Sequence, residues 1–124
     1  MNEARKLDEN IQSTDCDLQE VNESRQLWQT EPSNLDNLFS FAVLLAKSRI
    51  TADRRTAAQH LKHLVAMEYN LTATLFQYSI VLYSLEQYDS ARQTIASLLR
   101  LEPESKQIKD LHAAMTYKVD DLIL

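Results

Sequence analysis

The sequence predicts an all-α protein, built as an antiparallel six-helix stack. The chain of 124 residues contains no glycine and two prolines. Tight hairpins and Gly-rich phosphate loops both need glycine at positions of positive φ. Because the chain has no glycine, we expect neither of them here. Apolar residues recur at helical spacing through most of the sequence. One set of four returns 34 positions later: Ala57, Leu61, Leu64 and Val65 reappear as Ala91, Ile95, Leu98 and Leu99.

A period of 34 residues is the length of a tetratricopeptide unit, a helix-turn-helix whose small residues let two helices approach closely. Two tandem tetratricopeptide-like hairpins, at about 34–66 and 71–101, fit the repeat. Two units alone would leave both ends of the apolar stack exposed, so we expect a capping helix on each side. Such units bind other chains far more often than they catalyse reactions.

The N-terminal part divides into an arm and a helix. Residues 1–14 are polar without helical apolar spacing, which predicts a mobile N-terminal arm ahead of a helical domain over 15–124. Within 15–30, four side chains share one helical face, namely Leu18, Val21, Arg25 and Trp28. The residue before Pro32 avoids the helical region, so the helix should end there. We expect Trp28 to pack this helix onto the first repeat.

In the first hairpin, Ser33 is the predicted N-cap of a helix over 34–49, with Asp36 completing a weak capping-box pattern. The second helix of this hairpin is expected over 53–66. In the second hairpin, Asn70 can cap a helix over 71–85, followed by a helix over 88–101.

Pro103 suits the first turn of a sixth helix, where its missing N–H costs nothing. That helix carries apolar residues at helical spacing: Ile108, Leu111, Met115 and Val119.

Composition excludes several functional classes. A net charge of −5 argues against a nucleic-acid partner, which needs a basic surface. The single cysteine rules out an intrachain disulfide. The sequence contains no run of about 18 apolar residues, so we expect no membrane span in it. His60 and His63 lack an evident third ligand, so no metal or cofactor is expected. No catalytic motif is evident, and we predict that the protein is not an enzyme.

Phasing the repeats on Ala57 and Ala91 predicts which side chains line the concave face. In tetratricopeptide stacks the first helix of each repeat lines this face. The predicted partner-binding groove therefore consists of Phe39, Ala42, Ala46, Arg49, Ala73, Phe76, Ile80 and Tyr83. It is apolar, which suits the apolar side of a partner helix or an extended segment.

Several ordered motifs resemble those of the mitochondrial fission 1 family. Phe39-Ser-Phe-Ala-Val-Leu-Leu-Ala-Lys-Ser-Arg49 is similar to its F-x-Y-A-x-x-L-x-x-S pattern. Tyr83-Ser-Leu-Glu-Gln-Tyr-Asp-Ser-Ala-Arg92 resembles Y-x-L-x-x-Y-x-x-A-x, and Leu98-Leu-Arg-Leu-Glu-Pro-Glu-Ser-Lys-Gln107 resembles L-L-x-x-E-P-x-N-x-Q. The likeness covers roughly 38–122. A departure is Val81, where the family carries a glycine in its fourth helix.

The resemblance implies a tail-anchored adaptor on the outer mitochondrial membrane, and often on peroxisomes. It would recruit a dynamin-related GTPase, directly or through a fission adaptor protein, and it could form a homo-oligomer. The family's C-terminal anchor would follow the sixth helix, where this chain ends, so we expect a soluble truncation. In the resembled family the N-terminal arm can lie in or near the groove.

Two other readings remain open. A soluble chaperone-type adaptor would grip C-terminal carboxylates, but that job needs Lys and Asn where Ala42 and Ala46 stand. A helical-repeat subunit of a larger complex is the other alternative. About 20 apolar residues encoded directly after Leu124 would favour the anchored adaptor.

Overall fold

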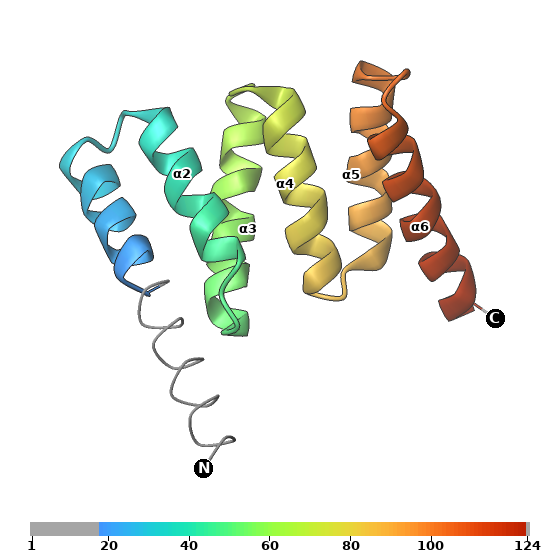
Figure 1. Cartoon of the computed structure of the whole chain (residues 1–124), viewed down its shortest axis with the longest axis horizontal. Helices are drawn as coiled ribbons and strands as arrows, with labels where there is room; N and C mark the ends of the chain where they lie inside the picture. Colours follow the sequence, from blue (N-terminus) through green and yellow to red (C-terminus); the bar gives the residue numbers. More distant parts are fainter. Residues whose placement is uncertain (1–17, 124) are drawn as a thin grey trace, which may run out of the picture.

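The fold is a single row of antiparallel helices (Figure 1). The computed structural model describes residues 18–123. A helix over 18–30 is followed by α2 (Leu35–Ala46), α3 (Thr51–Ala66), α4 (Leu71–Ser84), α5 (Tyr88–Leu101) and α6 (Lys106–Ile123). From α2 onward each helix packs chiefly on the next one, with a smaller contact between α2 and α4. α2, α4 and α6 lie on one side of the row, with α3 and α5 on the other. The predicted six-helix antiparallel stack is confirmed.

The repeated positions form the centre of the core. Six of the eight residues of the 34-residue repeat are fully buried, at 0% exposure: Ala57, Leu61, Leu64, Ala91, Ile95 and Leu98. The alanines at the start of each set permit close helix approach, and the larger residues fill the space between helices. The two halves of the stack are therefore built alike, as the period predicts.

The buried apolar residues divide into two clusters. The first includes Phe41, Leu45 and Leu61 and joins α2 and α3, while the second includes Leu75 and Ile95 and joins α4, α5 and α6. Val81, which replaces a glycine of the resembled family, is 1% exposed and lies in the first cluster. Tyr78 packs against both clusters, so the two halves share an aromatic side chain from α4.

The helices at each end cover the stack as expected. The Trp28 ring stacks on Phe41 with 5.5 Å between centroids, and it meets the His60 ring edge-on at 5.0 Å. At the other end, Ile108 and Met115 of α6 are buried in the second cluster. These contacts confirm both the capping arrangement and the predicted place of Trp28.

The connection within the first hairpin differs from prediction. The N-cap of α2 is Asn34, because its side-chain oxygen accepts the Asn37 N–H at 3.1 Å. Ser33, the predicted cap, lies in the preceding turn. After α2 the Ser48 hydroxyl accepts the Ile50 N–H and donates to the Asp53 carboxylate at 2.7 Å. This closed turn explains why α2 ends earlier and α3 begins earlier than predicted.

The start of α6 also differs from prediction. Pro103 lies in the turn, and α6 begins at Lys106. The Ser105 hydroxyl accepts the Ile108 N–H at 3.3 Å, so serine caps the helix. The predicted arm over residues 1–14 lies outside the described residues.

Turns that normally use glycine are made here with other residues. Glu68, Asn70 and Glu86 have φ of 55°, 36° and 62°. Glu68 and Glu86 each directly follow the C-cap residue of a helix, the position where a left-handed glycine is usual. Although the chain has no glycine, these three residues still adopt positive φ. Asn70 precedes α4 as predicted, but its side chain forms no capping hydrogen bond.

Candidate protein-binding groove

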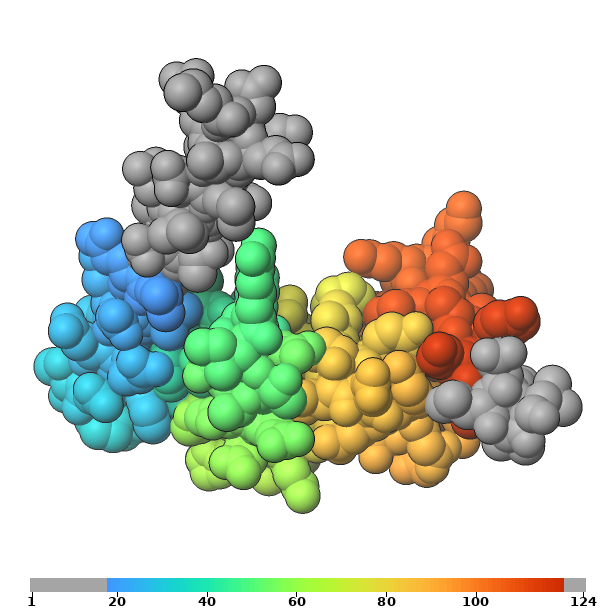
Figure 2. All heavy atoms as spheres, turned by 90° about the horizontal axis from the view of Figure 1, so that it is seen from below, coloured from blue at the N-terminus to red at the C-terminus, as the bar shows by residue number. Residues whose placement is uncertain are grey.

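The face formed by α2, α4 and α6 is hollowed over α4. Figure 2 turns this face to the top of the picture and shows the hollow between α6 and the α2–α3 side. Ala73, Phe76, Ile80 and Tyr83 follow one line along α4, because their spacings are those of a single helical face. Ile80 and Tyr83 are 39% and 38% exposed. An apolar stripe on α4 is therefore open to a partner.

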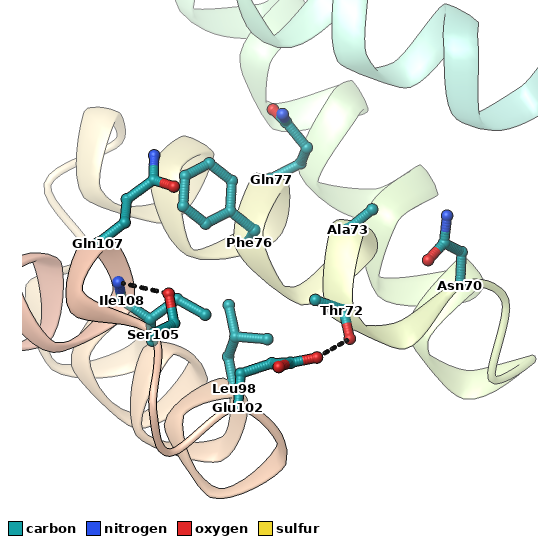
Figure 3. A pocket seen from close by; sticks show the side chains of 10 residues that line it. All are labelled: Asn70, Thr72, Ala73, Phe76, Gln77, Leu98, Glu102, Ser105, Gln107 and Ile108. Carbon is teal, nitrogen blue, oxygen red and sulfur yellow. Dashed lines mark hydrogen bonds between the residues drawn. The ribbon is translucent and has the colours of Figure 1, made fainter.

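One end of this stripe runs into a pocket of about 380 Å³ between α4 and the α5–α6 corner (Figure 3). The pocket is lined by Asn70, Thr72, Ala73, Phe76, Gln77, Leu98, Glu102, Ser105, Gln107 and Ile108. Its size lies at the low end of the range for ligand pockets, so it suits one or two side chains. It contains two of the residues predicted from sequence, Ala73 and Phe76.

The pocket combines an apolar floor with a polar rim. Leu98 and Ile108 belong to the core, and the Phe76 ring extends across the pocket towards Gln107. Glu102 is the one charged residue among those lining the pocket, and its carboxylate accepts a long hydrogen bond, 3.5 Å, from the Thr72 hydroxyl. The site can therefore hold an apolar group beside a hydrogen-bonding or cationic one.

The other end of the stripe carries aromatic rings and a cation. The Tyr83 ring meets Tyr88 of α5 edge-on at 5.1 Å. The Lys118 ammonium of α6 lies over the Tyr88 ring, 5.3 Å from its centroid. The groove thus has an acidic group near the start of α4 and a basic one near its end.

Ala42, one of the four groove residues predicted on α2, cannot contact a partner. It is 0% exposed and lies in the first core cluster, against which Val21 and Trp28 pack. Its side chain is a single methyl group, which closely packed neighbours cover completely. The predicted contact position is wrong because the repeat phasing treats α2 and α4 alike, whereas α2 is covered by the helix over 18–30.

The other α2 positions do not join the α4 pocket. Phe39 is half-buried and its ring lies 5.7 Å from that of Tyr69. Ala46 is half-buried against the first cluster. Arg49 follows the end of α2 and lines a different hollow, together with Leu18 and Ile50. Partner binding by these residues stays a prediction.

Sequence reasoning missed the part of the pocket that α5 and α6 supply. The signal was the same 34-residue period, continued one unit further. Gln107 lies 34 positions after Ala73, and Ile108 lies 34 positions after the buried Thr74. α6 therefore occupies the place of a first helix in a third repeat, which brings Gln107 and Ser105 beside α4.

Burial and hydrogen bonding account for the shifted pKa values of His60 and Tyr69. Burial, followed by the charge of His63, lowers the pKa of His60, which sits against Trp28 and Phe41. The Tyr69 hydroxyl donates to the Asp36 carboxylate, and this hydrogen bond raises the pKa of Tyr69.

Within residues 18–123, no group of three or more His, Cys, Asp or Glu side chains could hold a metal. No helix in the described part of the chain is long and apolar enough to cross a membrane.

Comparisons with known proteins agree with the fold and the repeat. Residues 73–121 match the family model of the Fis1 C-terminal tetratricopeptide repeat. No curated protein matches the sequence. Solved structures similar to this chain include yeast Fis1 in complex with an Mdv1 fragment, at 24% identity and a TM-score of 0.79, covering 86% of this chain and 87% of that one.

Two further solved structures have a fold similar to that of this chain. Fis1 from Saccharomyces cerevisiae has 24% identity and a TM-score of 0.79, with 83% of each chain covered. The solution structure of yeast Fis1 has 24% identity and a TM-score of 0.76, covering 83% of this chain and 74% of that one. Over residues 73–121 the chain is therefore similar to the C-terminal repeat of Fis1, and over most of its length it has the same fold as yeast Fis1.

Proposed function

We propose that this protein recruits a dynamin-related GTPase, or an adaptor for one, to the outer membrane of mitochondria, and to peroxisomes as a second site, through the groove over α4. Yeast Fis1, which has the same fold, has been solved with a fragment of the adaptor Mdv1. The expected partner here is a protein segment of the same kind, held at its apolar face. The match of residues 73–121 to the family model of the Fis1 C-terminal tetratricopeptide repeat supports the proposed location.

The observation that carries the proposal is the open apolar stripe of α4. A soluble protein gains by covering large apolar side chains, so a line of partly exposed ones beside a hollow marks a contact site. Ile80 and Tyr83 leave more than a third of their surface open, although their neighbours Val81 and Leu82 are buried. From Ala73 to Tyr83 the stripe is about 15 Å long, which matches roughly three turns of a partner helix.

The test is binding of purified protein to a candidate partner, measured by calorimetry and by pull-down. The probes are a dynamin-related GTPase and an Mdv1-type fragment with its N-terminal extension and coiled coil. Ile80→Glu should weaken binding by tenfold or more, because a carboxylate buried against apolar groups without a partner costs several kcal/mol. Leu27→Glu is the matched control, since Leu27 is 61% exposed on the helix over 18–30.

Both variants must keep the helical content of the parent, measured by circular dichroism. Equal binding by folded Ile80→Glu and Leu27→Glu would refute the proposal that the partner binds in the groove. A second measurement compares the chain with and without residues 1–14. If this segment competes for the groove, its deletion strengthens the apparent affinity by a factor equal to the reciprocal of the fraction of molecules whose groove had been open.

A further inference from the structure

We infer that the pocket between α4 and the α5–α6 corner selects an apolar side chain that has a lysine or arginine next to it in the partner segment. This inference rests on the proposed function, since it specifies what the groove recognises at one of its ends. The apolar residue enters the pocket, and the neighbouring cation reaches the Glu102 carboxylate at its rim.

The floor of the pocket defines the first half of this pair. Leu98 and Ile108 are core residues, and Ala73 and Phe76 add the half-buried wall on the α4 side. A volume of about 380 Å³ accommodates a leucine- or phenylalanine-sized group. An apolar side chain placed here would continue the α4 stripe, which leads on to Ile80.

The rim is suited to a peptide backbone. Asn70, Gln77 and Gln107 carry amides, which both donate and accept hydrogen bonds. Among the described residues, these three side chains form no hydrogen bond. The Ser105 hydroxyl is already engaged as the cap of α6. Free amides beside an apolar pocket can pair with the N–H and C=O groups that flank an anchoring residue.

Glu102 defines the second half of the pair. No lysine, arginine or histidine lines the pocket, and the described part of the chain gives this carboxylate no ion pair. Its partner is the neutral Thr72 hydroxyl at 3.5 Å, longer than a strong hydrogen bond to a carboxylate. The whole chain has a net charge of −5, which adds to the attraction of a cation.

The test uses two blocked tetrapeptides as probes, acetyl-Ser-Leu-Lys-Ser-amide and acetyl-Ser-Leu-Glu-Ser-amide. Each is titrated into isotopically labelled protein at low salt, and backbone amide resonances are followed by NMR. The lysine peptide should shift the amides of Ala73, Gln77 and Gln107, with a dissociation constant on the order of 1 mM. The glutamate peptide should bind about fivefold more weakly or worse, as expected for an exposed charge.

The variants assign this preference to one carboxylate. Glu102→Gln should remove the preference for lysine, and Glu102→Lys should reverse it. Glu104→Gln is the matched control, because Glu104 is also exposed, lies two residues further on and does not line the pocket. It should keep the preference of the parent.

Several results would overturn the inference. These are no shifts with either peptide, shifts confined to other surfaces, or equal affinities for the two peptides. Shifts of the pocket resonances on raising protein concentration alone would assign the site to a second copy of this chain. Each result is independent of the Ile80→Glu experiment, so the pocket inference can fail while the proposed adaptor function stands.

Discussion

Replacing Glu86 with glycine should raise the free energy of unfolding. Glu86 has φ of 62° in the turn after α4, within the left-handed region. Two hydrogen bonds hold it there: its own N–H donates to the Tyr83 carbonyl, and the Gln87 N–H donates to the Leu82 carbonyl, both at 3.0 Å. This pattern is a Schellman motif, in which glycine is the usual residue.

The magnitude follows from two opposing terms. A side chain with a Cβ in the left-handed region costs about 1–2 kcal/mol. Glycine gives back about 0.5–1 kcal/mol, because it loses more conformational freedom on folding. The net stabilisation for Glu86→Gly should therefore lie within about 0–1.5 kcal/mol, with a midpoint of about 0.75 kcal/mol. Glu68, with φ of 55°, occupies the corresponding turn after α3, so the double variant should gain about twice as much.

The assay is urea unfolding followed by far-UV circular dichroism. Glu86→Ala is the control, since it also removes a carboxylate from a helix C-terminus, where negative charge is unfavourable, but keeps the Cβ. The difference between the glycine and alanine variants isolates the backbone term. A glycine variant no more stable than the alanine variant would refute the claim that this turn is strained.

Three further predictions concern the core and its end helix. Trp28→Ala should lower the free energy of unfolding by about 2–3 kcal/mol in urea titrations, because it removes a half-buried ring stacked on Phe41; a loss below about 1 kcal/mol would contradict this packing. The lowered pKa of His60 means that its contribution to stability is fully present above about pH 6.5 and is lost as pH falls through the lower folded pKa. Urea midpoints at pH 7.5 and 5 should therefore differ less in His60→Gln than in the parent. Val81→Ala should cost about 2 kcal/mol and the neighbouring Ile80→Ala less than about 1 kcal/mol, and equal losses would contradict their different burial.

The core was predictable because it depends on spacing alone. Ala57, Leu61, Ala91 and Ile95 follow helical periodicity within each unit and the 34-residue period between units, and all four are buried. Helix ends were less predictable, because neighbouring residues compete for the same role. Ser33 and Asn34 are both good N-caps, and hydrogen-bond geometry rather than composition selects between them.

The candidate site was only half predictable. The α4 stripe follows from phasing, since it needs one helix and its register. The pocket needs the position of α6 against α4, which depends on where α6 starts, and Ser105 rather than Pro103 sets that point. Ala42 was misplaced for a related reason, because its burial depends on packing around α2 that the period does not encode.

The position of Tyr78 gives α4 a special place in the energetics of the stack. Each helix packs chiefly on its sequence neighbours, so opening one end need not disturb the other. α4 is the exception, because Val81 belongs to the first cluster, Leu75 belongs to the second, and Tyr78 touches both. A ligand held on α4 would therefore slow hydrogen exchange in both halves of the protein. A contact limited to α6 would protect the C-terminal half alone, so the pattern of protection reports which helix a partner grips.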